Sequence, residues 1–220
     1  VWMVDGRIVD GKVEGVQAKE FDATGKIVCP GFIETQATLQ EPGWDDVETI
    51  VSGTAAAVAG GVTSVACLPE TEPVVDNRAA VEFILQQAVR SGTCHVFPLG
   101  AVTKNRFGEE LAEIGQLVEG GAVALSDGKR AVANAEVMRR GLEYAKMFGC
   151  RIFHHPQDAE LVAGGVMHEG LYSTLLGLGG MPAEAEEILV ARDVALAELT
   201  GGSLRLMTVT LSLIHITEPT

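Results

Sequence analysis

The chain has no uninterrupted apolar stretch of roughly 18 residues and no segment that resembles a signal peptide. These absences argue against a membrane span and predict a cytoplasmic location. Lysine and arginine are also few, with 16 against 30 aspartates and glutamates, for a formal net charge of −14. Because nucleic acids and anionic membranes are bound by clustered basic side chains, we expect neither kind of partner.

Cysteine is scarce as well. The four cysteines, at positions 29, 67, 94 and 150, lie far apart in the sequence, and no C-x-x-C pair occurs. Their neighbours are mostly apolar and strand-like. We therefore predict that Cys29, Cys67, Cys94 and Cys150 are buried free thiols in a reducing cytoplasm.

A G-x-G-x-x-G run after the first predicted strand is also missing, so the sequence gives no support for a dinucleotide site. What the chain does have is length and apolar content: 220 residues, 47% of them hydrophobic, are enough for a large domain with a substantial core. Continuous apolar segments alternate with amphipathic ones, which indicates a parallel α/β architecture. A barrel and an open doubly wound sheet are the two alternatives.

The same alternation predicts the organisation of the chain. Residues 1–26 alternate with period two around two Asp-Gly turns and predict a small N-terminal β-domain. Residues 27–210 predict a β/α barrel domain. Its predicted strands are 27–38, 62–68, 96–102, 122–125, 150–154 and 204–209. Its predicted helices are 46–59, 77–90, 109–118, 134–148 and 182–199.

Several short motifs occur in one order along residues 1 to about 210. They are Pro30-Gly31-Phe32-Ile33, Gln40-Glu41-Pro42-Gly43, Gly53-Thr54-Ala55-Ala56-Ala57, Gly60-Gly61-Val62-Thr63-Ser64-Val65, Val166-Met167-His168-Glu169-Gly170 and Pro182-Ala183-Glu184-Ala185-Glu186-Glu187. Together they resemble dihydroorotase, in the longer class that works beside aspartate carbamoyltransferase in pyrimidine biosynthesis. The resemblance implies a (β/α)8 TIM barrel, present here as an incomplete barrel of about six strands, with a small β-domain. It also implies zinc-dependent, reversible ring closure of carbamoyl aspartate.

Members of this family hold zinc with two histidines on the first strand, an acidic or modified lysine ligand on the fourth, and histidines on the fifth and sixth. Gln36 and Thr38 stand at the two first-strand positions, and Thr208 stands at the sixth-strand position. Neither an amide nor a hydroxyl is a good zinc ligand. We therefore expect a lost zinc site, no cofactor and no catalytic residue.

Two family metal positions keep a group that could bind metal. His155 opens a His-Pro-Gln-Asp run where the family has His-Cys-Glu-Asp, and Asp127 lies in a Ser-Asp-Gly run where the family usually has two aspartates. We favour His155 as a vestigial or hydrogen-bonded histidine and Asp127 as a turn residue. Metal coordination by either one is the alternative. His154 should point away from the barrel interior.

The positions that hold the substrate in this family have changed too. Gln40 stands where the family has an arginine, which removes a bidentate clamp for a carboxylate. Glu70 stands where the family has an asparagine, and its carboxylate would repel a substrate carboxylate.

Three hypotheses for the function follow. The first is a catalytically inactive dihydroorotase-like protein that serves as a structural partner of aspartate carbamoyltransferase, as some relatives do. The second is an active zinc-dependent dihydroorotase with unusual ligands. The third is another cyclic-amide hydrolase, related to hydantoinases or allantoinases. The Glu41-Pro42-Gly43 run favours the dihydroorotase branch over the third.

The end of the chain departs from the family pattern. Residues 211–220 resemble translated sequencing-adapter DNA, and we expect that they are not native sequence. The last two barrel strands and the family's catalytic aspartate are then missing. A barrel of six strands leaves its first and sixth strands as unpaired edges, so we expect an oligomer or an aggregating chain.

Overall fold

The computed structural model describes residues 2–11, 15 and 17–210, and the predicted atypical tail lies outside these residues. The chain divides into two units, Val1–Pro30 and Gly31–Thr220. In the first unit β1 (Trp2–Val4) and β2 (Arg7–Val9) pair antiparallel. Asp5 and Gly6 take φ values of 48° and 74° in the turn between them, as the Asp-Gly signature predicts. The described residues from there to Pro30 contain no further strand or helix.

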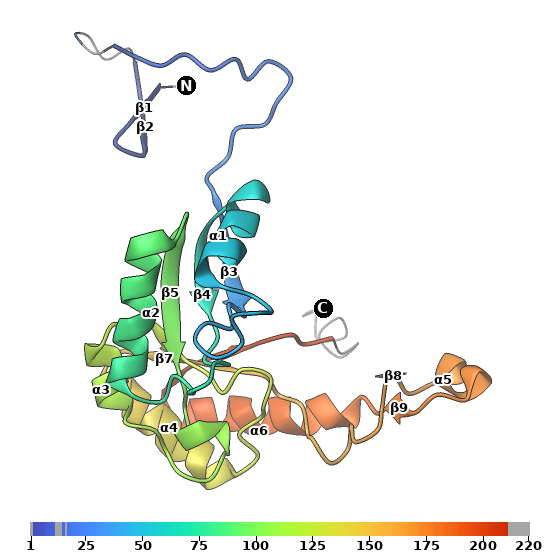
Figure 1. The fold of residues 1–220 in the computed structure, drawn as a ribbon. Coiled ribbons are helices and arrows are strands. Elements are labelled where there is room, and N and C mark those ends of the chain that lie inside the picture. The colour runs from blue at the N-terminus through green and yellow to red at the C-terminus, as the bar shows by residue number, and fades with distance from the viewer. Residues whose placement is uncertain (1, 12–14, 16, 211–220) are drawn as a thin grey trace. The chain divides into compact units, whose positions relative to one another are not determined.

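The second unit alternates strands and helices (Figure 1). Its main strands are β3 (Phe32–Ala37), β4 (Val62–Cys67), β5 (His95–Gly100), β6 (Ala124–Leu125), β7 (Arg151–His154) and β10 (Ser203–Leu206). Its helices are α1 (Ile50–Ala59), α2 (Arg78–Ser91), α3 (Ile114–Glu119), α4 (Ala135–Met147) and α6 (Glu184–Thr200), with a short 3-10 turn η1 (Lys104–Arg106).

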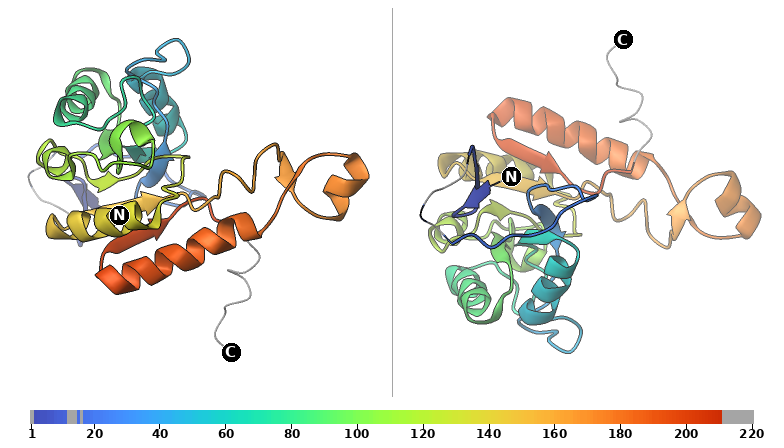
Figure 2. Two further views of the ribbon diagram at one scale, coloured as in Figure 1. Left: turned by 90° about the horizontal axis from the view of Figure 1, so that it is seen from below. Right: turned by 90° about the horizontal axis from the view of Figure 1, so that it is seen from above.

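The six main strands of the described residues form one parallel sheet in the order β10-β7-β6-β5-β4-β3. Each main strand therefore pairs with the main strand that follows it in the sequence. Between β7 and β10 the chain makes a short excursion outside this sheet. The sheet curls with its helices on the outer side, as the views in Figure 2 show. This is the incomplete barrel that the sequence predicts, and the open doubly wound sheet is not formed.

Side-chain caps set where several helices begin. The Thr49 side chain accepts a hydrogen bond from the Ser52 amide, and the Ser52 hydroxyl accepts one from the Thr49 amide. This capping box starts α1 at residue 50, so the prediction of a helix from residue 46 was too long. The Asn77 and Asn134 side chains cap α2 and α4 by accepting hydrogen bonds from backbone amides in the first turn of each helix, without a reciprocal bond. The predicted helix 109–118 begins only at Ile114, because Leu111 is held in a β-bridge to Thr103.

One excursion, between β7 and α6, was not predicted from the sequence. It contains β8 (Met167–His168), α5 (Leu171–Leu176) and β9 (Gly180–Met181), and β8 pairs with β9 in a separate parallel ladder. A second error concerns the first strand. It was predicted to start at residue 27, but β3 starts at Phe32.

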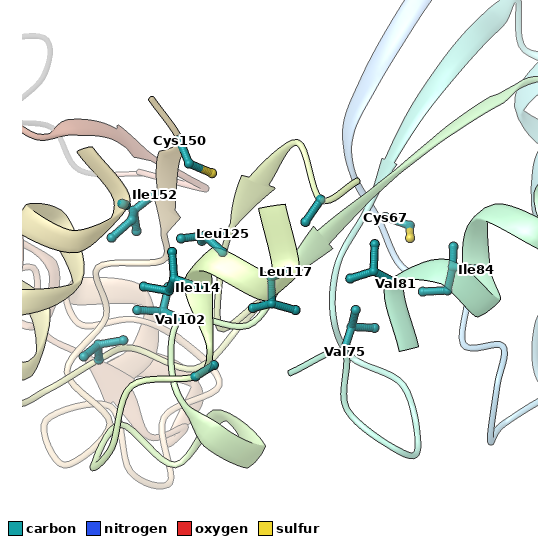
Figure 3. Packing of buried hydrophobic residues seen from close by; sticks show 14 of the residues in the cluster. Cys67, Val75, Val81, Ile84, Val102, Ile114, Leu117, Leu125, Cys150 and Ile152 are labelled. Atoms are coloured by element: carbon teal, nitrogen blue, oxygen red, sulfur yellow. The ribbon is translucent and has the colours of Figure 1, made fainter. Parts of the chain in front are cut away.

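The two faces of the sheet bury different sets of residues. Alternate strand residues such as Val65, Leu125 and Ile152 pack outward against the helices. Figure 3 shows this layer, with Val81 and Ile84 of α2 near Cys67 at the right of the view and Ile114 and Leu117 of α3 further left, towards Leu125. A smaller apolar cluster of Ala66, Leu68, Leu99, Ala124 and Met207 fills the inner face. Within the described part of the chain, no helix has both the length and the apolar character to cross a bilayer.

The prediction that all four cysteines are buried was only half right. Cys67 and Cys150 are buried free thiols, whereas Cys94 is half-buried and Cys29 is exposed. Cys29 lies in the stretch before β3 where the predicted strand is not formed, so nothing there buries the thiol.

Candidate functional site

The inner face of the sheet and the C-terminal ends of its strands carry most of the positions that the sequence analysis singled out. In β3 the outward residue is Ala37, which packs against the helix-side core. Gln36 and Thr38 therefore take the inner face on either side of it. In β7 the outward residues are Ile152 and His154, which leaves Phe153 and His155 to the inner face.

The structure brings together Gln36 and Thr208, two positions where the family resemblance implies histidine. The Thr208 hydroxyl donates a hydrogen bond of 3.4 Å to the Gln36 side-chain oxygen, across 172 residues of sequence. Thr208 takes a left-handed φ of 52° just beyond β10, which is uncommon for a β-branched residue. The end of the first barrel strand and the end of the sixth therefore meet at the mouth of the barrel through two neutral polar groups.

Glu70 is the centre of a second polar group at the mouth. It follows β4 and accepts hydrogen bonds from the Arg106 guanidinium at 2.9 Å and from the Lys129 amide at 2.9 Å. The Thr38 hydroxyl also donates to it at 3.4 Å. Glu70 and Arg106 are only 12% and 13% exposed, and burial lowers the pKa of Arg106 while the Glu70 charge opposes that shift. We expected the Glu70 carboxylate to repel a substrate carboxylate, but its charge is paired.

Arg106 is the residue that the sequence analysis missed. Its backbone takes a left-handed φ of 60°. Besides its contact with Glu70, its Nε donates a hydrogen bond to the Asp127 carbonyl at 3.0 Å. The available signal was a basic residue just beyond the end of a predicted strand. Gln40, the other replaced substrate position, is half-buried with a φ of 57° in the turn after β3. Its carbonyl accepts from the Trp44 amide at 3.0 Å.

Asp127 is buried at the end of β6, and both of its carboxylate oxygens accept hydrogen bonds from neighbouring residues. One carboxylate oxygen accepts from the amides of Val102 and Thr103, at 2.8 and 3.0 Å, and the other accepts from the Thr103 hydroxyl. Burial raises the pKa of Asp127, although these hydrogen bonds and the Arg106 charge act in the opposite direction. Gly128 follows it with a φ of 64°, and the Asp127 carbonyl accepts from the Arg130 amide. Asp127 thus lies in a turn and ties the ends of β5 and β6 together.

His154 points toward the helix layer, as its outward position in β7 predicts. Its Nε2 accepts from the Val132 amide at 2.9 Å, so Nδ1 carries the proton and donates to Asp193 of α6 at 2.5 Å. His155 is different. Its Nδ1 is buried and has no hydrogen-bond partner among the described residues. Of the two expectations for His155, a vestigial or a hydrogen-bonded histidine, the second is not met at this atom.

These groups do not fit a zinc ion, which needs several nitrogen, sulfur or carboxylate donors converging on one point. The Asp127 carboxylate accepts hydrogen bonds from backbone amides, and the Glu70 carboxylate is paired with Arg106. His155 alone would be only one ligand for the metal. Among residues 2–11, 15 and 17–210, no three His, Cys, Asp or Glu side chains lie close enough to hold a metal ion. The mouth instead presents amides, hydroxyls and one ion pair that bond to one another.

The comparison with known proteins agrees with the fold and with the motifs. The model of a family described as dihydro-orotase-like matches residues 25–211. The chain belongs to the dihydroorotase-like family. A protein named dihydroorotase from Pelotomaculum thermopropionicum is 51% identical over 203 residues, which are 91% of this chain and 47% of that relative. Another from Solibacter usitatus is 48% identical over 206 residues, 90% of this chain and 48% of the relative.

This dihydroorotase-like chain thus spans about half the length of the curated relatives it matches. Among solved structures, L-hydantoinase (dihydropyrimidinase) from Arthrobacter aurescens superposes with a TM-score of 0.69 at 18% identity, covering 88% of this chain and 45% of that one. At so low an identity this likeness shows the fold alone.

Proposed function

We propose that this chain is a dihydroorotase-like protein of pyrimidine biosynthesis that does not catalyse the ring reaction and acts as a structural partner of aspartate carbamoyltransferase. The observation that carries the first half is the hydrogen bond between Gln36 and Thr208. Two positions where the family has zinc-binding histidines hold neutral side chains that satisfy each other. The partner role rests on the family resemblance, because inactive relatives serve the transferase in this way.

The first experiment measures metal and activity together. The purified chain is incubated with one equivalent of zinc and desalted, its zinc is counted by mass spectrometry, and ring opening of dihydroorotate is followed. The dihydroorotase of Pelotomaculum thermopropionicum serves as the control. We expect less than about 0.1 zinc per chain and no turnover, because the donors do not converge. Near-stoichiometric zinc with turnover would refute the proposal.

A second experiment tests the partner role. The chain is co-expressed with aspartate carbamoyltransferase and purified by a tag on either protein, and transferase activity is measured with and without this chain. We expect co-purification and higher or more stable transferase activity in the complex. Two proteins that elute separately, with transferase activity unaffected, would refute the partner role and leave the metal result standing.

The second candidate is an active zinc-dependent dihydroorotase with unusual ligands. Two observations favour it: relatives about 50% identical are named dihydroorotase, and the buried His155 Nδ1 lacks a partner. Replacing Gln36 and Thr38 by histidine separates the two candidates. If the site is dismantled, zinc content and activity stay low in this double variant, because Thr208, Gln40 and Glu70 are unchanged. A third candidate, another cyclic-amide hydrolase, has only the hydantoinase-like fold in its favour.

A further inference from the structure

A hollow lies on the outer, helical layer of the barrel, between α3 and α4 (Figure 1). It encloses about 420 Å³, which is within the range of roughly 300–1,000 Å³ that is typical of small-molecule sites. The two helices supply different parts of its lining. The residues concerned are Glu113, Gly115, Gln116 and Glu119 on the α3 side and Tyr144 and Phe148 on the α4 side.

The hollow lies over the middle of the sheet. α3 leads into β6 and α4 leads into β7, and each of these strands has a sheet partner on both sides. Any further strand would join the sheet at β3 or β10, which are its open edges in the described residues. The lining of the hollow therefore does not depend on what pairs with those edges.

A glycine and two aromatic rings form the walls of the hollow. A Cβ atom at position 115 would lie 2.8 Å from the Cζ atom of Phe148, so Gly115 is what lets this ring pack against the backbone of α3. Tyr144 and Phe148 are four residues apart and share one side of α4. Their rings meet edge to face, with centroids 5.4 Å apart and an interplanar angle of 88°. The wall on the α4 side is therefore aromatic.

The side chains on the α3 side make the hollow negative. Glu113 and Glu119 are both exposed, and Glu113 has no ion pair among residues 2–11, 15 and 17–210. Glu119 has the Arg78 guanidinium at 3.9 Å, but that guanidinium is bonded more closely to Glu82, at 2.6 Å. The described lining contains no lysine or arginine. The hollow therefore favours a cation over an anion.

The aromatic rings narrow the kind of cation. Tyr144 and Phe148 are each 39% exposed, so part of each ring is open to a ligand. Cations bind over aromatic faces within about 6 Å of the ring centre, and a planar guanidinium stacks there with less loss of hydration than an ammonium. A guanidinium also donates a forked pair of hydrogen bonds to a carboxylate, which Glu113 offers. The side-chain carbonyl of Gln116 is a further acceptor in the lining.

We propose that the hollow between α3 and α4 is a binding site for a guanidinium group, which stacks on the Tyr144–Phe148 pair and bonds to Glu113. A free guanidinium compound and an arginine side chain of another protein both carry this chemistry. The inference is independent of the proposed function, because it uses no residue of the barrel mouth.

The test is a titration of the full, isotopically labelled chain, followed by its amide signals in NMR spectra. The probes are ethylguanidinium, the peptide acetyl-Gly-Arg-Gly-amide and the same peptide with citrulline, which keeps the shape of arginine without its charge. We expect saturable shifts at Gly115 and Gln116 with a Kd on the order of 1 mM, and binding of the citrulline peptide at least about ten-fold weaker. Binding of the arginine peptide identifies a side chain as the source, and binding of ethylguanidinium alone identifies a free compound.

A double variant tests the aromatic and acidic parts of the lining. Tyr144→Leu combined with Glu113→Gln removes one ring and one charge, and it should raise Kd at least about ten-fold. The matched control is Glu143→Gln, because Glu143 is next to Tyr144 in α4 but pairs with Arg139 and does not line the hollow. Its Kd should stay within about two-fold of that of the unchanged chain. Circular dichroism checks that each variant is folded.

Gly115→Ala tests the shape of the hollow without removing a charge. The added methyl group would meet the Phe148 ring, so the ring has to move and binding should weaken. Four outcomes would overturn the proposal. They are no saturable shift with either cation up to about 10 mM, equal binding of the citrulline peptide, shifts centred outside the hollow, and an equal loss of binding in Glu143→Gln and the double variant.

Discussion

Glu70 and Arg106 show how single replacements at the barrel mouth are stabilised. The pair is mostly buried, and Glu70 also accepts from the Lys129 amide and the Thr38 hydroxyl. Its carboxylate therefore joins the ends of β3 and β4 to the loop after β6 and to η1. Glu70, at a position that the family resemblance assigns to substrate binding, is thus bonded to the chain's own groups.

Replacing Glu70 by alanine should destabilise the chain by about 2–4 kcal/mol, because it leaves the Arg106 charge buried without a partner. Urea unfolding followed by circular dichroism measures the change. Glu110→Ala is the matched control, since Glu110 pairs with Lys104 on the surface, where the side chains are 70% and 46% exposed. That variant should change stability by less than about 1 kcal/mol. Equal effects of the two variants would contradict the scaffold role of Glu70.

The cysteines allow a second test at this scale. Burial raises the pKa of the Cys67 thiol to about 12 and also blocks access to it, whereas Cys29 is exposed. At pH 8 a disulfide reagent such as Ellman's should titrate Cys29 rapidly in the folded protein and leave Cys67 unreacted until the chain unfolds. In Cys29→Ser the fast phase should disappear. Rapid reaction of Cys67 in the folded protein would show that β4 is not packed as described.

The sequence predicted some of these residue environments and not others. The alternation of β7 correctly placed His154 on the helix side, because side chains alternate strictly along a strand. Arg106 was missed because its position depends on a left-handed φ in a non-glycine residue, which no periodicity reveals. The exposure of Cys29 was missed for a related reason, since an apolar sequence alone does not say that a strand has begun.

At the scale of the elements, a buried group of hydrogen-bonded side chains connects β7 to α6. His154 donates through Nδ1 to Asp193, and the Arg192 guanidinium donates to the other oxygen of the same carboxylate at 2.6 and 2.9 Å. His154 and Asp193 are 1% and 0% exposed. The buried group fixes the rotation of α6 on the sheet.

Asp193→Ala should therefore destabilise the unit by about 2–4 kcal/mol and loosen α6 in particular. Hydrogen exchange followed by mass spectrometry should show faster exchange in residues 184–206 than in α1 or α2. Glu198→Ala on the exposed side of the same helix is the control, and its exchange should match that of the unchanged chain. A uniform increase in exchange across all helices would mean that the pair supports the whole fold and not α6 alone.

The existence and order of the main strands and helices followed from the sequence, because long amphipathic helices and buried strands have strong periodic signals. The excursion between β7 and α6 did not. Its helix has six residues and depends on Ser173 and on the β8–β9 pairing, which are contacts made only in the folded chain. In the same way, the family resemblance named Gln36 and Thr208 as positions of the barrel mouth, but the contact between them depends on how strongly the sheet curls.

At the scale of the molecule, the sheet has two open edges in the described residues, β3 and β10. The β3 edge carries Phe32 and Ile33, which are 59% and 68% exposed. Unpaired backbone groups beside exposed apolar side chains favour edge-to-edge association. If the β3 edge of one copy paired with the β10 edge of the next, the association would repeat without closing.

Ile33→Lys should raise the soluble yield of the chain about two-fold or more, because a lysine on an edge strand opposes further pairing. The measurement is the protein left in solution after concentration and centrifugation. Val89→Lys, which adds the same charge at an 88% exposed position on α2, is the control and should give a smaller gain. An equal gain from both variants would mean that net charge alone, and not the edge, governs solubility.

The strand order has one further consequence, which concerns synthesis on the ribosome. Because β3, β4, β5, β6, β7 and β10 pair in the order in which they are made, each new strand finds its neighbour already in place. Among the six main strands of residues 17–210, each pairs with the main strand made next, although the outer edge of β3 stays unpaired. The longest wait is that of β7, since β10 joins it only after the excursion of residues 161–183 and α6 have emerged.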